Sequence, residues 1–490
     1  MNKLACSVVL ALLIIIHTSH AQEQVKNIEY LTLQDIIRLA KNQSTWALRA
    51  EVVKENRYWQ YRVFKSNYNP QLRLSGELPN FQRTFQQVRQ PSGDYQVRFI
   101  NNNNSSLNLS LSQSIGLTGG EIFLDSELRR FDDFTNDRIE YNTNPLFIGF
   151  RQPLFSFNPL LWDKKIEPLR YEESKREYVE DMENISKEAT RRFFDLMLAQ
   201  VDIEIAAKNL ANNDTIFKIA QGRYNLGNIA ENELLQLELN LMNSRQSVAQ
   251  ANLDLETSSL RLKSYIGYTG SQAISLILPE SIPEFAVNDM VALRQALANR
   301  SEAISFRREV LEAERDVAQA KGNAGLDANL FGSFGLTNRA DDFESIYANP
   351  SDQQQVRIGF EIPIVDWGRT KSRVKTAEAN KKLAEFAVQQ NRVQFEEEIL
   401  TQVRLFNMLR NQIEITQKSS EIGQKSYDIS KNRFLIGKIS ITDLNDALEK
   451  KDQARRRYIQ SLDEFWTAYY EMRRLTLYDF AENEVLYKGE

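Results

Sequence analysis

The sequence nearly lacks the two residue types on which most metal binding and much enzyme chemistry depend. Its 490 residues include one cysteine, Cys6, and two histidines, His17 and His20. All three fall within residues 1–21, which have the pattern of a secretory signal peptide: a positive start, a short apolar core and a small-x-small ending. A mature chain beginning at residue 22 would contain neither cysteine nor histidine.

This absence excludes whole classes of function. Disulfides, thiol nucleophiles, histidine-based triads and zinc sites with His or Cys ligands all require residues that the mature chain lacks. Acid–base chemistry would rest on carboxylates, Lys or Tyr alone. The paired carboxylates at Asp341–Asp342 and Glu396–Glu398 are typical of solvated surface. We therefore expect no catalytic residue, no metal site and no cofactor, and predict that the chain is not an enzyme.

Long apolar runs and strong positive charge are also missing. Beyond the signal no apolar stretch approaches the 18 residues typical of a transmembrane helix. The formal net charge is −5, which gives no electrostatic basis for binding nucleic acid. Strands of a transmembrane β-barrel remain possible, because their alternating pattern leaves only a weak hydropathy signal.

Glycine and proline are missing from four very long segments, and these segments predict helices. They are rich in Leu, Ala, Glu, Lys, Arg and Gln, and they cover 169–221, 228–266, 369–422 and 438–488. A helix of about 50 residues would be ~75 Å long. Residues seven apart indicate coiled-coil packing: Leu234, Leu241, Val248, Leu255 and Leu262 in one segment, and Ala447, Ala454, Ser461 and Ala468 in another.

The chain is also internally duplicated. The sequence Ile148–Pro153 returns 210 residues later as Ile358–Pro363, while farther upstream the copies align 256 apart, as at Leu74 and Leu330. This predicts a first structural repeat at 22–266, a connector at 267–289 and a second repeat at 290–490. Each repeat should contain a short amphipathic helix, near 33–63 and 290–320, then strands and a long helical hairpin.

Strands are predicted by strict alternation before each hairpin. Leu107, Leu109 and Leu111 alternate with polar residues, and the same period recurs from Val356 to Ile362. The pattern suits strands between lipid and water, or a half-buried sheet of a soluble protein. The 46-residue difference between the two offsets indicates extra strand sequence in the first repeat, with a turn at Ile115–Gly120. Two or three strand pairs cannot close a barrel alone, so strands in a membrane would have to be pooled between chains.

Three segments together resemble the TolC-like outer-membrane efflux ducts. The opening Leu31–Ile36, the strand end Ile148–Pro153 and the turn region Arg223–Leu235 carry the likeness, and they recur in the family's order of strand, hairpin and tip. The resemblance implies a mixed fold: an all-α coiled-coil barrel reaching through the periplasm, joined to a transmembrane β-barrel of 12 strands shared by a homotrimer. The 46 extra residues leave the strand count per chain open.

The family resemblance also implies a function and partners. The chain would be the outer-membrane exit duct of a tripartite efflux or type I secretion system in a Gram-negative bacterium, in contact with outer-membrane lipid. A periplasmic adaptor (membrane fusion) protein and an inner-membrane RND or ABC transporter would deliver its substrate. The alternative from the sequence is a soluble periplasmic coiled-coil adaptor or scaffold protein. No interaction with nucleic acid is expected.

Candidate functional residues lie at the two glycine-containing turns between long helices. The adaptor-docking tips would comprise Leu226, Gly227, Asn228, Ile229, Ile436, Gly437 and Lys438. By the resemblance, Asp443 and Asp446 would form an acidic ring at the pore entrance, with Asp443 alternatively completing a capping box with Ser440. Glu233 would be the acidic member of a closing latch. Phe434 and Ile439 stand where the family has tyrosine and arginine, so closure would rest on apolar packing.

Overall fold

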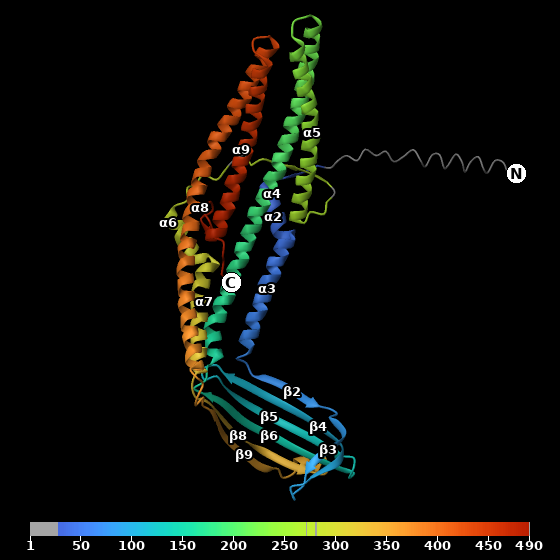
Figure 1. Cartoon of the computed structure of the whole chain (residues 1–490), viewed down its shortest axis with the longest axis vertical. Helices are drawn as coiled ribbons and strands as arrows, with labels where there is room; N and C mark the ends of the chain where they lie inside the picture. The colour runs from blue at the N-terminus through green and yellow to red at the C-terminus, as the bar shows by residue number, and fades with distance from the viewer. Residues whose placement is uncertain (1–27, 271, 280–281, 490) are drawn as a thin grey trace, which may run out of the picture. The chain divides into compact units, whose positions relative to one another are not determined.

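The computed structural model describes residues 28–270, 272–279 and 282–489, so the predicted signal peptide lies outside the described residues. The order of elements repeats along the chain, which confirms the duplication (Figure 1). The first copy comprises β1 (Ile28–Leu31), α2 (Leu33–Gln43), α3 (Thr45–Ser66), β2 (Gln71–Glu77), β3 (Phe81–Arg89), β4 (Tyr95–Ile115), β5 (Gly120–Asp133), β6 (Arg138–Leu154), α4 (Pro159–Asn225) and α5 (Glu231–Ile266). Strand β7 (Ala273–Leu276) lies in the predicted connector and pairs parallel with β1. The second copy comprises α6 (Asp289–Asn299), α7 (Ser301–Gly322), β8 (Asp327–Ala340), the short helix η1 (Ser345–Tyr347), β9 (Ser351–Glu361), α8 (Arg369–Leu435), α9 (Ile441–Thr476), β10 (Tyr478–Asp479) and β11 (Glu484–Val485).

Packing groups the chain into two compact units, each built from both copies. The hairpin unit comprises the described residues of Met1–Glu51 together with Val179–Gln295 and Ile399–Glu490. The sheet unit comprises Val52–Tyr178 and Ala296–Glu398. Segments from the two sequence repeats therefore share a core in each unit.

The four long helices form as predicted, with shifted ends. Helices α4 and α8 each contain 67 residues, and α5 and α9 each contain 36. The prediction of helix up to residue 488 was wrong, because Leu477 has left-handed backbone (φ 46°) and ends α9. The chain then forms the small antiparallel pair β10–β11. Among the described residues, none of the helices combines the length and the hydropathy that crossing a membrane requires.

The short helix predicted at the start of each copy is two helices. In the first copy the break is Ser44, which has extended backbone and accepts a hydrogen bond from the Ala47 N–H at 3.1 Å. In the second copy Arg300 is extended at the same place. A serine hydroxyl competes for backbone donors at a helix start, which explains the first break.

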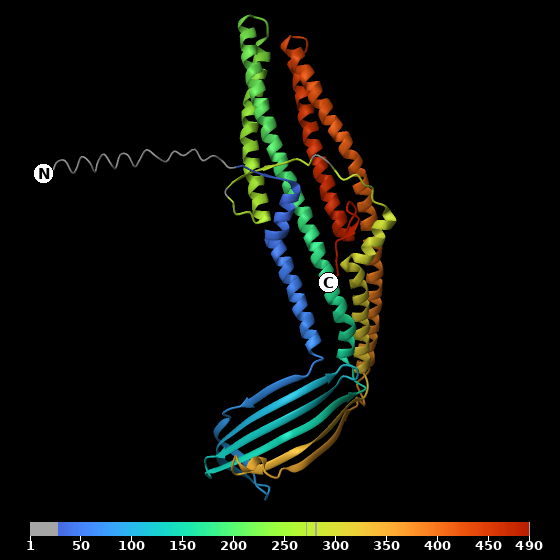
Figure 2. The same cartoon turned by 180° about the vertical axis from the view of Figure 1, so that it is seen from behind.

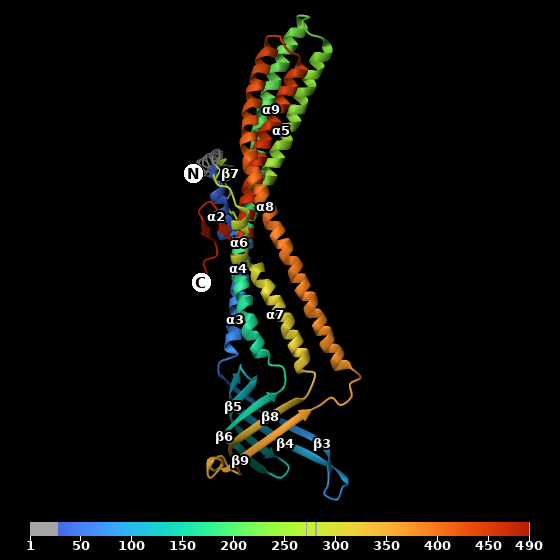
Figure 3. The ribbon, with the colours of Figure 1, turned by 90° about the vertical axis from the view of Figure 1, so that its left-hand side faces the viewer.

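The predicted coiled-coil positions are shielded in both hairpins. In α5, Leu241 and Leu262 are buried and the other three heptad residues are half-buried. In α9, Ala447, Ser461 and Ala468 are buried and Ala454 is half-buried. The hairpins α4–α5 and α8–α9 are drawn in green and in orange to red in Figure 3. The hairpin unit contains α5, α9 and the parts of α4 and α8 that begin at Val179 and Ile399.

The large antiparallel sheet has the strand order β2-β4-β5-β6-β8-β9 (Figure 2). The β3 strand also pairs with β4, along the same edge as β2: residues Gln71–Glu77 face Ser112–Ser106, and Phe81–Arg89 face Asn103–Tyr95. Thus β2 and β3 are one strand interrupted at residues 78–80. The predicted turn at Ile115–Gly120 is confirmed, since it joins β4 to β5.

Each chain supplies six strand positions to the large sheet. A 12-stranded barrel shared by three chains, as the family resemblance implies, would need only four per chain. Leu74 lies in β2 and its copy Leu330 in β8, while Ile148 lies in β6 and its copy Ile358 in β9. The strands β4 and β5 therefore have no counterpart in the second copy. They account for the 46 extra residues of the first copy.

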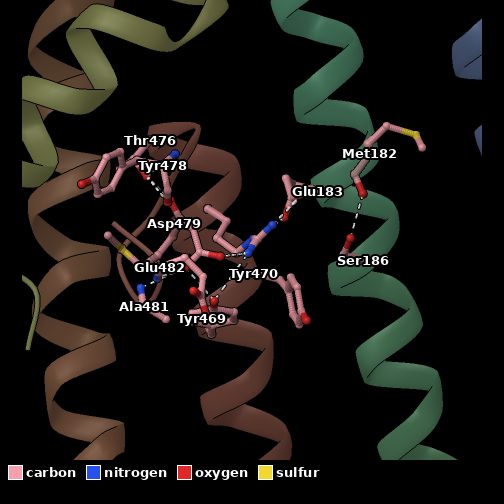
Figure 4. Close-up of polar contacts among 12 residues, drawn as sticks. Met182, Glu183, Ser186, Tyr469, Tyr470, Thr476, Tyr478, Asp479, Ala481 and Glu482 are labelled. Atoms are coloured by element: carbon pink, nitrogen blue, oxygen red, sulfur yellow. Dashed lines mark hydrogen bonds and ion pairs between the residues drawn. The ribbon is translucent and has the colours of Figure 1, made fainter. Parts of the chain in front are cut away.

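A buried ion-pair cluster joins α9 to α4 and α2 inside the hairpin unit. The carboxylate of Glu183, whose side chain is 4% exposed, lies 2.7 Å from the Arg473 guanidinium and 2.7 Å from the Lys41 ammonium. Arg473 also pairs with Asp479, which accepts a hydrogen bond from the Tyr469 hydroxyl at 2.9 Å. Figure 4 shows Glu183 on one helix facing the Tyr469 and Asp479 region on the other.

The charges of this cluster depend on one another. Burial by itself raises the pKa of Glu183, but hydrogen bonds and attraction from Arg473 and Lys41 outweigh it and lower the pKa below its ordinary value. Removing one partner of such a cluster leaves a buried charge without compensation. The end of α9 and the following turn are thus fixed by electrostatics as well as by packing.

The substitution Glu183→Gln tests this role. Loss of the buried carboxylate should lower the free energy of unfolding by about 3–5 kcal/mol at pH 7. A group whose pKa is lowered by folding stabilises above its unfolded pKa, near 4.5, and its contribution disappears as the pH falls. The difference between wild type and variant should therefore shrink below about pH 4, as measured by circular dichroism in denaturant.

The control is Glu204→Gln, which removes an exposed pair with Lys208 one helical turn away. This change should lower the free energy of unfolding by less than about 0.5 kcal/mol. Equal destabilisation by the two substitutions would contradict the assigned role of Glu183.

Candidate functional site: the two hairpin tips

Each long hairpin turns back at a glycine in left-handed conformation. Gly227 has φ 73° and Gly437 has φ 75°. At the first tip the Asn228 N–H donates to the Arg223 carbonyl at 2.9 Å and the Gly227 N–H to the Tyr224 carbonyl at 2.8 Å. The second tip repeats both bonds. This Schellman arrangement satisfies the last carbonyls of the helix and needs a residue that tolerates positive φ.

The tips present exposed apolar side chains at copy-related positions. Leu226 is 77% exposed and Ile436, the residue 210 later, is 66% exposed. A Cβ placed on Gly227 or Gly437 would meet no atom within 4 Å, so both turns are surrounded by open space. Each tip thus offers an uncovered surface that extra side-chain volume would change directly.

A small apolar core holds the four helix ends together beneath the tips. Its buried members come from all four long helices: Ile216, Ala220, Leu237, Tyr427, Leu444 and Ala447. Ile229 and Phe434 are partly buried against this cluster. Phe434 therefore packs as an apolar residue, as its lack of a hydroxyl predicts.

A groove of about 500 Å³ lies between the two tips, within the hairpin unit. Six of the predicted site residues line it: Asn228, Ile229, Glu233, Phe434, Gly437 and Ile439. An acidic side chain and two apolar ones thus line the same space. The other predicted site residues do not line it: Leu226, Gly227, Ile436, Lys438, Asp443 and Asp446.

Asp443 and Asp446 lie on α9 and are both exposed. Asp443 completes a capping box: its carboxylate accepts hydrogen bonds from the Ser440 hydroxyl at 2.7 Å and from the Ser440 N–H at 3.0 Å. These bonds, with attraction from Arg433, hold the pKa of Asp443 below its ordinary value. Asp446 pairs at 2.6 Å with Lys450, one turn along the helix. The capping interpretation of Asp443 is confirmed, and it keeps the carboxylate ionised.

Polar bonds between the two hairpins were missed from the sequence. Arg223 donates to the Leu435 carbonyl at 2.8 Å, Asn209 to the Asp452 carboxylate at 2.7 Å, and Asp202 pairs with Arg456 at 2.6 Å. On α4 these residues are spaced by seven or fourteen, so they share one helix face with Ile216 of the apolar core. A heptad search that included polar residues would have found this face.

In the part of the chain that the structure describes, no group of three or more acidic, histidine or cysteine side chains is arranged to hold a metal ion. The tips offer exposed apolar side chains, hydrogen-bonding groups and charges of both signs, such as Glu233 and Lys438.

Comparison with known proteins decides the family. The family model described as "outer membrane efflux protein" matches residues 39–268 and 292–476, which includes both helical hairpins and all strands of the large sheet. The chain belongs to the outer membrane efflux protein family. The two matched segments also fall one on each copy of the duplication.

Solved structures show the same fold for this efflux protein. The CmeC outer membrane channel of Campylobacter jejuni has a TM-score of 0.65 at 17% identity, over 91% of this chain and 85% of that one. The outer membrane protein VceC of Vibrio cholerae has a TM-score of 0.60 at 15% identity, over 91% and 95%. A membrane protein from Pseudomonas aeruginosa has a TM-score of 0.65 at 13% identity, over 93% and 92%. No curated protein sequence matches the chain.

Family membership settles the general function. The efflux protein is an exit duct of the outer membrane, and the predicted mixed fold of helical barrel and strands is confirmed. The alternative of a soluble periplasmic adaptor is not supported. Because members of this family are passages for solutes, the prediction that the chain is not an enzyme is confirmed by the family. The individual tip and entrance residues stay predictions.

The bond from Arg223 to the Leu435 carbonyl should hold the second tip against the first. Replacing Arg223 with Leu removes a hydrogen bond worth about 1 kcal/mol, so amides of residues 433–439 should exchange with deuterium about fivefold faster. Hydrogen-exchange mass spectrometry of the tips measures this. Arg433→Leu is the matched control, since Arg433 is the copy of Arg223 and interacts with Asp443. Equal exchange at residues 433–439 in wild type and Arg223→Leu would contradict the assignment.

Proposed function

We propose that the efflux protein acts as a homotrimer that receives solutes at its hairpin tips and releases them outside the cell. A periplasmic adaptor protein binds the tips, and an inner-membrane transporter of the RND or ABC class supplies the solute. The observation that carries this proposal is the pair of copy-related tips. Both expose a large apolar residue, Leu226 or Ile436, beside a glycine turn with open space around it.

The chemistry of the tips favours a protein partner. Exposed apolar side chains at a rim gain free energy when a partner removes them from water, about 25 cal/mol per Å² of apolar area. Two such tips per chain give six contact points in a trimer, arranged by its symmetry. The groove beside them is lined in part by Glu233, which adds a polar element that can fix the orientation of a bound segment.

Substitution at the tip glycines tests docking. We expect Gly437→Trp together with Gly227→Trp to abolish efflux, because the added rings occupy the surface on which the adaptor binds. The matched control changes both glycines to Asn, which tolerates left-handed backbone and adds little volume. Efflux is measured as accumulation of a fluorescent substrate in cells that lack their own duct.

Assembly must be intact for this comparison to be valid. Both double variants should be found in the outer-membrane fraction as SDS-sensitive trimers, by fractionation and native mass measurement in detergent. Normal efflux by the Trp variant would show that the tips are not the contact. A wild-type chain that is monomeric in detergent would contradict the trimer itself.

The acidic residues that follow the second tip are proposed to line the entrance. Asp443 and Asp446 are exposed and three residues apart on α9, so they project from neighbouring positions of one helix. In a trimer they would supply six carboxylates to one constriction, where low-dielectric walls strengthen their field. The capping bonds of Asp443 support this role, because they keep its carboxylate ionised.

Neutralising both residues tests the ring. In Asp443→Asn/Asp446→Asn the side-chain oxygen that accepts the Ser440 bonds is retained while the charge is lost. We expect the variant to lose preference for cations and to need a several-fold higher concentration of trivalent cations for block in planar bilayers. If wild type and variant show equal cation selectivity and equal block, the two residues form no acidic ring and Asp443 acts only as a helix cap. Glu449→Gln, farther along α9, is the control for loss of an exposed charge.

A further inference from the structure

The sheet unit contains a complete extra pair of strands in its wall. Strand β4 pairs with β2 and β3 on one side and with β5 on the other, and β5 continues onto β6. The pairing of β4 with β5 runs over fourteen consecutive residue pairs, from Asn102 with Asp133 to Ile115 with Gly120. The added strands are therefore part of the sheet itself and form neither a loop nor a plug.

The side chains of the added strands match the rest of the wall. Following the register across the sheet, one face carries apolar residues on every strand: Leu72, Leu74, Leu107, Leu109, Leu111, Ile122, Leu124, Ile148, Phe150, Leu330, Phe334, Val356, Ile358 and Phe360. Most of these residues are exposed in the single chain. The apolar residues form a band that continues across β4 and β5, from Leu107–Leu111 to Ile122–Leu128, as a lipid-facing wall requires. Beyond this band the same face is polar, with Asn103 paired to Asp132.

The opposite face is polar apart from an aromatic cluster. Ser110, Asp125 and Arg357 lie on this face by the same register. The rings of Phe123 and Phe331 stack with centroids 6.0 Å apart, and the Arg357 guanidinium lies 5.2 Å over Phe331. This face suits a water-filled bore, because charged and hydroxyl groups on it stay hydrated.

Both edges of the sheet are open in one chain. Every residue of β2 and of β9 is exposed, and these strands end the order β2-β4-β5-β6-β8-β9. Because neighbouring strands are antiparallel and there are six positions, β2 and β9 run in opposite directions. Strand β9 of one copy can thus pair antiparallel with β2 of the next, and this closes a ring without an unpaired edge in lipid.

We propose that three copies close a barrel of eighteen strands whose bore passes polar solutes too wide for a barrel of twelve. This inference rests on the proposed trimer. With strands ~4.8 Å apart and tilted ~40°, the backbone diameter would be ~36 Å for eighteen strands and ~24 Å for twelve. After side chains are allowed for, the open cross-section is roughly three times larger.

The size of the bore is measured by polymer exclusion. Poly(ethylene glycol) of graded size is added only to the exterior side of a planar bilayer that holds the wild-type channel, so that it samples the barrel from outside. We expect polymers with a hydrodynamic diameter of about 20 Å to enter and to lower the conductance. The number of chains is measured in parallel by native mass spectrometry.

A chain without the added strands is the control. Replacing residues 85–140 with the loop 341–350 removes 46 residues net and gives the first copy the strand plan of the second. This variant should form a trimer that excludes the 20 Å polymer. If this variant fails to fold, the polymer size that the wild-type channel excludes and the mass of the wild-type oligomer still test the eighteen-stranded barrel.

The outcomes separate this inference from the proposed function. A trimer that admits the 20 Å polymer supports the wide barrel. A trimer that excludes polymers above about 14 Å overturns it, and a dimer overturns it too, since two chains supply only twelve strands. Both of these results leave an outer-membrane duct in place. A protein that forms no channel at all would contradict the duct instead.

Discussion

The structure depends on one constraint: backbone groups of a sheet in lipid must all be paired, since no water is present to replace a missing hydrogen bond. A single chain supplies six strand positions and leaves the edges at β2 and β9 open. The chain therefore cannot be a finished membrane protein alone. An insertion in such a wall must also contain an even number of strands, because an odd number would send the following helix to the wrong side. The pair β4–β5 satisfies that condition.

The helices obey a different constraint: two long hairpins pack side by side and leave their turns uncovered. Glycines in left-handed conformation close both turns, and a shared apolar core with Ile216, Tyr427 and Leu444 holds the four helix ends together. The bond from Arg223 to the Leu435 carbonyl joins the two turns directly. The far end of α9 is fixed by the buried charges around Glu183. A duct needs both features: a rigid wall and a rim that can bind a partner.

Much of this could be predicted from the sequence, because it rests on local patterns. The glycine turns, the alternation at Leu107–Leu111 and the copy distance each reflect a periodic backbone geometry. The two copy distances differ by 46 residues, which predicts the length of the insertion. They do not predict that the inserted residues form the strand pair β4–β5. The break at Ser44 and the end of α9 at Thr476 were missed, because one hydroxyl and one left-handed residue decided them against good helix propensity.

The hydrogen-bond and ion-pair partners of the polar side chains near the tips were the features least predictable from the sequence. The sequence allows Asp443 to be a helix cap or a pore residue, and the structure shows the cap while the carboxylate stays exposed and charged. The contact of Asn209 with Asp452 joins residues 243 positions apart, so nothing local indicated it. Long-range pairs of this kind follow from how two hairpins pack, which a single sequence does not specify.

The most direct test of the account is covalent trapping of the sheet edges. The only cysteine of the sequence is Cys6, and residues 22–490 contain none, so cysteines introduced into the sheet with Cys6 changed to Ser act against a clean background. Ser75→Cys on β2 is combined in turn with Gln355→Cys, Arg357→Cys or Gly359→Cys on β9, which lie on the same face of the sheet. Oxidation in outer membranes should give a ladder of species that ends at three chains for at least one pair. Partners on the opposite face, such as Val356→Cys, should give none. Monomers for every pair, or a ladder that continues beyond three chains, would contradict a closed trimeric ring.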